Sequence, residues 1–165
     1  MSQTILPTDL YVNGNVSAKT ISLPASTVTD TSVIASAGIQ ASKLQHQYED
    51  ILAQGSAVAA TAQTQTVHAV KGATATIVDF SAGAIVVAIG ADTCTVDCKK
   101  NGTTILTGTI SLTNAQSARQ LVQGSLSVTS AVAGDVFEVV ITPNHTSGTL
   151  ANGIFCRLTI REDAQ

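Results

Sequence analysis

The chain has 165 residues and a formal net charge of −3; hydrophobic residues make up 44% of it, charged residues 12% and aromatic residues 3%. That length suits one domain, or one domain with an appendage. The acidic balance, with no basic stripe and no stacking aromatics, argues against a nucleic-acid partner. The longest apolar run, residues 82–91, is about half of what a membrane-spanning helix needs, so no membrane partner is expected.

The composition of residues 1–60 predicts that this segment is an extended arm, which mediates anchoring and oligomerisation. They are rich in Ser, Thr and Ala, their aliphatic residues are isolated, and Pro7 and Pro24 interrupt them. Such a segment buries too little apolar area by itself to offset its ordering entropy, so it needs a partner surface. The residues expected to contact that partner are Ile5, Leu6, Leu10, Tyr11, Val16, Ile21, Leu23, Val33, Ile34, Ile39, Leu44 and Tyr48.

The first fourteen residues have no basic start, no continuous apolar stretch and no small-residue cleavage site, so no signal peptide is predicted. A cytosolic site of synthesis and reduced thiols follow from that prediction. The scarcity of charge also predicts that much of the surface is covered by other chains, because well-behaved soluble surfaces carry about 25–35% charged residues.

A short helix is predicted over residues 42–55. Ser42 is placed to cap its N-terminus, and Gly55 is placed to end it. The apolar residues between them recur at helical spacing, namely Leu44, Tyr48, Ile51 and Leu52.

Residues 61–165 predict a β-sandwich domain. About eight strand-like runs follow one another, separated by turn residues, and this spacing indicates an all-β, antiparallel, jelly-roll-like sandwich. The runs are QTQTVHAV, ATATIVDF, AIVVAIG, TCTVDCK, TTILTGTISLT, RQLVQGSLSV, DVFEVVIT and GIFCRLTIR, and the turns are expected at Lys71-Gly72, Ser81-Ala82-Gly83, Asn101-Gly102, Ala133-Gly134-Asp135 and PNHTSG. Alternation places Phe137, Val139 and Ile141 on one face of a strand, and it places Ile154, Cys156, Leu158 and Ile160 on one face of another.

The segment TCTVDCKKNGTTIL, residues 93–106, comes closest to an enzymatic motif. Its alternation predicts a strand, in which Cys94 and Cys98 lie about 13 Å apart, beyond the roughly 7 Å that a disulfide spans. Both cysteines, together with Cys156, are therefore expected to be free, buried thiols. Asn101-Gly102 suits the two positive-φ positions of a type I′ turn.

No catalytic, cofactor-binding or metal-binding residue is predicted. His46, His68 and His145 have no Cys or carboxylate at ligand spacing. Catalytic triads assemble across a fold, but no Gly-x-Ser-x-Gly elbow nominates a nucleophile. A single carboxylate at Asp135 lacks the oxygen ligands of a calcium site, so Asp135 is interpreted as a residue that caps a turn.

Several phrases resemble those of bacteriophage virion surface proteins of the head-decoration or fibre type. TDTSVIASAGIQASKL resembles their linker repeats, and VNGNVSAKTISLP is similar to their threaded β segments. TVDCKKNGTTIL, AVAGDVFEVVIT and GTLANGIFCRLTIRE resemble small β-sandwich domains of phage structural proteins. The resemblance implies a homo-oligomer, most simply a trimer, in a virion that is assembled in the host cytoplasm.

The expected function is that of a capsid decoration protein, which binds the major capsid protein or other virion proteins through its arm and displays the sandwich outward. The alternatives are a tail-fibre or baseplate subunit, or a module that binds host-surface glycans. Sugar platforms rely on exposed Trp or Tyr, whereas Trp is absent here and both Tyr11 and Tyr48 precede the predicted sandwich. The structural role is therefore favoured over glycan binding.

Overall fold

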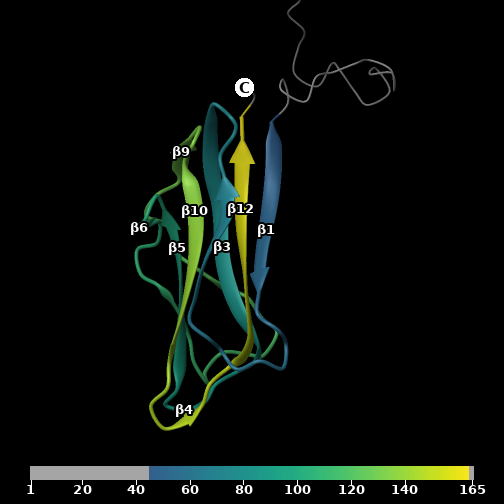
Figure 1. Ribbon diagram of the computed structural model, residues 1–165, viewed down its shortest axis with the longest axis vertical. Coiled ribbons are helices and arrows are strands. Elements are labelled where there is room, and N and C mark those ends of the chain that lie inside the picture. The colour runs from purple at the N-terminus through teal and green to yellow at the C-terminus, as the bar shows by residue number, and fades with distance from the viewer. Residues whose placement is uncertain (1–44, 164–165) are drawn as a thin grey trace, which may run out of the picture. The chain divides into compact units, whose positions relative to one another are not determined.

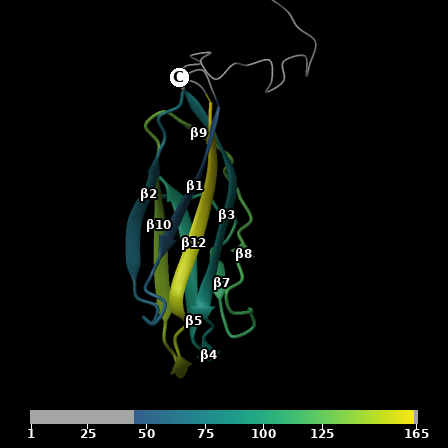
Figure 2. The same ribbon diagram turned by 90° about the vertical axis from the view of Figure 1, so that its right-hand side faces the viewer.

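The structure, a computed structural model, describes residues 45–163, and these form an antiparallel β-sandwich. Figures 1 and 2 show the two main sheets as packed layers. Sheet A has the order β1-β12-β3-β8, with β9 also paired to β3, and sheet B has the order β2-β10-β5-β6, with β7 also paired to β5. The all-β, antiparallel sandwich predicted from the sequence is confirmed.

Each sheet combines strands from distant parts of the chain. Sheet A consists of β1 (His46–Ala53), β12 (Asn152–Glu162), β3 (Thr74–Val86), β8 (Val122–Gln123) and β9 (Ser130–Val132). Sheet B consists of β2 (Gln63–Ala69), β10 (Val136–Asn144), β5 (Thr93–Lys100), β6 (Thr103–Thr104) and β7 (Ile110–Leu112). A small third sheet pairs β4 (Ile89–Gly90) with β11 (Gly148–Thr149).

The core lies between the two sheets and follows the alternation of the strands. In β5 every second residue is buried, and Cys94, Val96 and Cys98 are each 0% exposed. The shared faces predicted for residues of β10 and β12 are confirmed, and both face the core, since all seven of those residues are buried. Phe80 and Phe137 are the largest fully buried side chains, and burial of each contributes about 1.5–3 kcal/mol.

The three cysteines are free and buried, as predicted. Burial raises the pKa of the Cys94 thiol to about 11. Burial also raises the pKa of the Cys156 thiol to about 11, although its contact with the Leu52 carbonyl acts in the opposite direction. Burial is also the main reason why the pKa of Cys98 is raised. Such thiols stay protonated at neutral pH, which makes them weak nucleophiles.

The helix predicted over residues 42–55 is wrong, because this part of the chain contains strand β1. All eight residues of β1 pair with β12, from His46 opposite Glu162 to Ala53 opposite Phe155. Leu52 faces the core, whereas Ile51, which helical spacing placed beside it, is 69% exposed. Pairing with a long central strand overrides the local helical signal. The sandwich sheet therefore begins at His46, inside the range that the sequence assigned to the arm.

The turn predicted at Ser81-Ala82-Gly83 is also wrong, because these residues lie within β3. Gly83 is needed there for close packing, since a Cβ at this position would lie 2.3 Å from the Gln120 carbonyl oxygen. Two predicted strands thus merge into β3, while the run from Thr103 to Thr113 divides into β6 and β7. The run RQLVQGSLSV forms only the two-residue strand β8 and an isolated bridge at Leu126.

Candidate functional site

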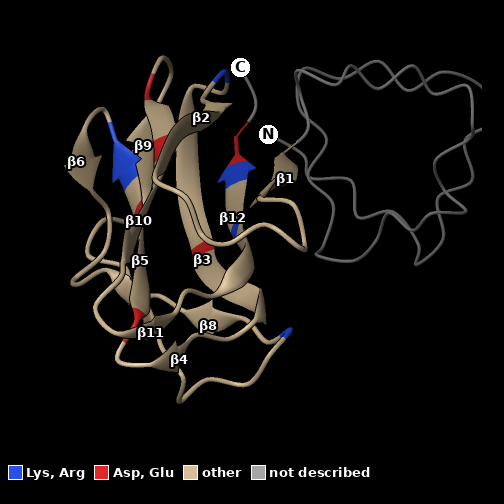
Figure 3. Cartoon of the chain, turned by 60° about the horizontal axis from the view of Figure 1, so that its bottom comes forward, with Lys and Arg blue, Asp and Glu red and all other residues tan. Residues whose placement is uncertain are grey.

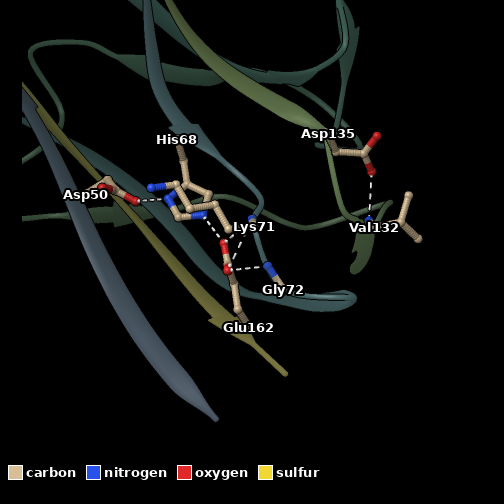
Figure 4. Close-up of polar contacts among 7 residues, drawn as sticks. All are labelled: Asp50, His68, Lys71, Gly72, Val132, Asp135 and Glu162. Carbon is tan, nitrogen blue, oxygen red and sulfur yellow. Dashed lines mark hydrogen bonds and ion pairs between the residues drawn. The ribbon is translucent and has the colours of Figure 1, made fainter. Parts of the chain in front are cut away.

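A cluster of one histidine and two carboxylates joins the sheets where the chain enters β1. Asp50 lies on β1, His68 on β2 and Glu162 on β12, and Figure 4 shows both carboxylates directed at the imidazole ring. A β-bulge between β2 and β10 shifts the register beside Phe137, so that His68 lies opposite this buried ring. We call Asp50, His68 and Glu162 the clasp.

Each ring nitrogen of His68 lies close to a carboxylate oxygen. The Nε2 atom is 2.8 Å from Oε1 of Glu162, in hydrogen-bonding geometry. The Nδ1 atom is 2.8 Å from Oδ2 of Asp50, but this contact is an ion pair without a directed hydrogen bond, because Oδ2 is buried and has no hydrogen-bond partner. The side chains of His68 and Glu162 are 9% and 5% exposed.

Glu162 also fixes the loop between β2 and β3. Its Oε2 atom accepts a hydrogen bond from the Gly72 amide at 2.7 Å, and the Lys71 amide lies 3.2 Å from Oε1. Burial raises the pKa of Glu162, but the hydrogen bonds from His68, Gly72 and Lys71 outweigh burial and leave the pKa below its ordinary value. A side chain at residue 72 would meet the Asp163 carbonyl oxygen at 2.6 Å, so the clasp requires glycine there.

The clasp does not have the geometry of a catalytic triad. In a triad one imidazole nitrogen faces a nucleophile, while the other is held by a carboxylate. In His68 both nitrogens face carboxylates, so neither is placed to take a proton from a hydroxyl or thiol. In this geometry the clasp can hold β1, β2 and β12 together electrostatically.

A second buried carboxylate organises the opposite end of the sandwich. Asp92 is 0% exposed, and its Oδ1 atom accepts hydrogen bonds from the amides of Thr146 at 2.8 Å and Ser147 at 3.0 Å. Its Oδ2 atom contacts Nδ1 of His145. Burial raises the pKa of Asp92, yet these three contacts together bring it below its ordinary value. Asp92 therefore ties the start of β5 to the loop that follows β10.

Asp135 caps a turn, as the sequence predicted. Its Oδ2 atom accepts a hydrogen bond from the Val132 amide at 3.0 Å, also drawn in Figure 4, and its Oδ1 atom accepts one from the Asn101 side chain at 2.7 Å. Lys100 lies 3.4 Å from Oδ2. The Val132 and Asn101 hydrogen bonds are the main reasons why the pKa of Asp135 is lowered, against a smaller effect of burial.

The spacing of His, Asp and Glu residues along the sequence did not predict the clasp. His68 and Glu162 are separated by 94 positions, and Asp50 lay in a segment that was interpreted as a helix. The pairing of β1 with β12 brings Asp50 and Glu162 into one sheet, and the packing of the two sheets places His68 of β2 between them. In the described part of the chain, no group of three or more His, Cys, Asp or Glu residues is arranged to hold a metal ion.

Of the partner-contacting residues predicted from the sequence, only Tyr48 lies within the described residues. It is on β1 and 40% exposed, and its ring centroid is 5.4 Å from that of His68 and 6.3 Å from that of His46. Tyr48 therefore packs beside the clasp. The others lie outside the described residues, namely Ile5, Leu6, Leu10, Tyr11, Val16, Ile21, Leu23, Val33, Ile34, Ile39 and Leu44.

Comparisons with known proteins give no family for this chain. No protein-family model matches it, and no curated protein sequence matches it. Within residues 45–163, no helix has the length and apolar character needed to cross a membrane. Figure 3 shows that charged residues are few and dispersed over the sandwich, in keeping with the 12% of the composition.

Proposed function

We propose that the chain is a structural, non-catalytic component of a bacteriophage particle, a capsid decoration protein that binds the shell through its N-terminal segment. The main support for the proposal is that the sandwich encloses its hydrophobic core between its own two sheets. Its buried carboxylates, Glu162 and Asp92, accept hydrogen bonds from backbone amides of the same sandwich. The aliphatic residues of positions 1–44 are then the part of the chain that needs an external surface. The resemblance of both regions to phage virion proteins supplies the identity of that surface.

The structural role is supported over the glycan-binding alternative by where the aromatic rings lie. Phe80 and Phe137 are 0% exposed, Phe155 is half-buried, and Tyr48 packs beside His68. Tyr48, which is 40% exposed, is thus the one Phe or Tyr side chain of the described residues that is open to solvent, and a single ring packed beside His68 offers a sugar only a small stacking surface. The alternative, a tail-fibre or baseplate subunit, would also attach through its N-terminal segment and display the sandwich. It would differ in the particle surface that this segment contacts.

Co-sedimentation of the full-length chain with particles that lack it tests the proposal. The informative variant combines Val16→Asp, Ile21→Asp and Leu23→Asp, which place charge on the aliphatic positions of the N-terminal segment. We expect the unaltered chain to co-sediment and this variant to remain in the supernatant, because burial of an aliphatic side chain contributes about 1.5–3 kcal/mol that a carboxylate removes.

The matched control is Ile51→Asp, which changes an aliphatic residue that is 69% exposed on β1 of the sandwich. This control should bind particles as the unaltered chain does. Equal co-sedimentation of the triple variant would show that the N-terminal segment is not the anchor. Failure of the unaltered chain to bind any particle would reject the virion role itself.

A further inference from the structure

Each of the two main sheets carries a buried cysteine on its inner face. Cys98 lies on β5 of sheet B, and Cys156 lies on β12 of sheet A. Both side chains are fully buried, and both thiols are free. The core of the sandwich therefore contains one thiol from each layer.

The strand registers assign each cysteine to a row of residues that crosses its sheet. In sheet B, Cys98 pairs with Val139, and Val139 pairs with Gln65 of the edge strand β2. In sheet A, Cys156 pairs with Leu52 of the edge strand β1. The position of one row relative to the other is thus decided by how β1 and β2 are aligned.

Two side-chain contacts fix the alignment of β1 with β2. His68 of β2 contacts Asp50 of β1 at 2.8 Å, within the clasp. Further along both strands, Nε2 of Gln54, which follows β1, donates a hydrogen bond to Oε1 of Gln63 at 3.1 Å. These contacts connect the two sheets at two different heights along the same edge of the sandwich.

The two cysteine rows both begin between these contacts. Gln65 lies between the two contact residues of β2, and Leu52 lies between those of β1. The rows of Cys98 and Cys156 therefore face each other across the core. Burial is the main reason why the pKa of Cys98 is raised, and the electrostatic effect of the nearby Cys156 adds to it. The two thiols are thus neighbours within the core.

The third cysteine has no such neighbour. Cys94 lies four residues from Cys98 on the same strand, about 13 Å away. It pairs with Pro143 and Leu112, and only burial raises the pKa of its thiol. Cys94 is therefore an internal control for any reaction of the other two thiols.

We propose that Cys98 and Cys156 form a disulfide that joins the two sheets when the protein meets a small-molecule disulfide as oxidant. We call this bond the redox latch. One cysteine thiolate attacks a sulfur of the oxidant and displaces one thiolate from it, and the second cysteine then attacks the mixed disulfide and displaces the other. The protein loses two protons and two electrons, and the oxidant becomes two thiols.

Closure of the redox latch requires a small local approach of the sheets. Stacked sheets lie about 10 Å apart, whereas a disulfide joins Cα atoms up to about 7 Å apart. The neighbours of the two cysteines in their rows are small, with Ala82 beside Cys156 and Val139 beside Cys98, so no bulky side chain separates the layers there. Disulfides between sheets occur in other β-sandwiches, which shows that two layers can approach this closely.

Burial also sets the rate at which the redox latch closes. The thiolate is the attacking species, and both cysteines have a raised pKa and no access to solvent. We therefore expect the folded, reduced protein to react slowly and a refolding chain to react quickly. The inference concerns the sandwich alone, so it stands independently of the proposed virion role.

Refolding in a glutathione redox buffer tests the proposal on the full-length chain. The reduced chain is unfolded in urea and diluted into a mixture of reduced and oxidised glutathione. Free thiols are then blocked by alkylation, and the peptides are mapped by mass spectrometry. We expect the main product to contain a disulfide between Cys98 and Cys156 and an alkylated Cys94.

Three products would overturn the proposal, and none requires a substitution in the core. They are a folded chain with three alkylated cysteines, a folded chain with glutathione attached to a cysteine, and a disulfide that includes Cys94. As a matched pair of variants, Cys94→Ala should still form the redox latch, whereas Cys156→Ala should leave Cys98 as a free thiol.

Urea denaturation shows whether the native fold accommodates the bond. The disulfide closes a long loop between positions 98 and 156 and so restricts the unfolded chain. We expect the oxidised protein to have a higher urea midpoint than the reduced protein, and dithiothreitol should abolish the difference. An equal or lower midpoint after oxidation would mean that the bond distorts the sheets, and it would overturn the proposal.

Discussion

Asn101 and Gly102 turn the chain from β5 into β6 through two left-handed residues. Their φ angles are 50° and 82°, and Lys100 pairs with Thr103 across the turn. This is the geometry of a two-residue type I′ hairpin, whose twist matches that of the strands it joins. The Asn101 side chain also donates to Asp135 and accepts from the Val136 amide, so the turn is anchored to the start of β10.

Gly102 and Gly108 form a natural pair for testing the cost of a left-handed backbone. A Cβ at either residue would meet nothing within 4 Å, but only Gly102 has a positive φ. We expect Gly102→Ala to lower the free energy of unfolding by about 1–2 kcal/mol, because a Cβ is strained in that region. Urea denaturation of the two alanine variants measures the difference. Equal stability of Gly102→Ala and Gly108→Ala would contradict the backbone argument.

At this scale, features set by neighbouring residues could be predicted from the sequence. The hairpin needs only Asn-Gly between strand-forming residues, and the burial of Cys94 and Cys98 follows from alternation with period two. The partners of His68 could not be predicted, because each lies on a different strand and no local pattern marks it. The buried role of Asp92 likewise depends on a loop more than fifty residues away.

Between elements, the clasp is the main polar link of β2 to β12. Removal of His68 takes one hydrogen bond from the buried Glu162 carboxylate, which keeps the Gly72 and Lys71 amides as donors, and loss of a hydrogen bond to a charged group costs about 1.5–3 kcal/mol. We therefore expect His68→Leu to lower the free energy of unfolding by about 3 kcal/mol, measured by urea denaturation, since Glu162 and Asp50 would then lie together without the imidazole.

A double-mutant cycle isolates the contribution of the pair. In a Glu162→Gln background, His68→Leu should cost less than it does in the unaltered protein, because part of its effect has already been removed. His145→Leu is the matched control, since this histidine is 63% exposed and lies at the other end of the sandwich. Identical costs of His68→Leu in both backgrounds would show that the histidine acts through packing against Phe137 and Tyr48 alone.

The elements whose type was predicted wrongly share one cause. Residues 46–53 carry an apolar spacing compatible with a helix, and only eight backbone pairs with β12 make them a strand. Ser81-Ala82-Gly83 has the composition of a turn, but it lies within β3, where the absence of a side chain on Gly83 lets the Gln120 carbonyl oxygen approach closely. In both cases a long-range contact decided the outcome, whereas β10 and β12, with strong alternation, were predicted correctly.

For the molecule as a whole, the buried and turn-capping carboxylates make stability depend on pH in the acid range. Glu162, Asp92, Asp135 and Asp163 all have a folded-state pKa below the ordinary value. The unfolded chain therefore binds protons first as the pH falls. The stability that these groups contribute is complete above their ordinary pKa values of 4.5 for Glu and 3.8 for Asp, and it is lost as the pH falls through the lower folded values.

We expect the urea midpoint to be lower at about pH 3.5 than at about pH 7. The decrease should be smaller in Asp92→Asn, which removes one of the linked groups, than in the control Glu49→Gln, a variant of an exposed residue on β1. An unchanged midpoint over this range would mean that the native contacts of these carboxylates do not favour their charged form.

The pairing of the first and last strands decides how the sandwich bears mechanical load. Gln45 donates to Asp163, and the first residue of β1 pairs with the last of β12, so both ends of the described chain lie at one pole (Figure 1). A force that separates residues 45 and 163 breaks the β1–β12 hydrogen bonds one after another, like a zip. A force between Gln45 and the loop held by Asp92 at the far pole runs along the strands and loads many hydrogen bonds at once. The sandwich therefore resists tension between its poles far better than tension between its ends.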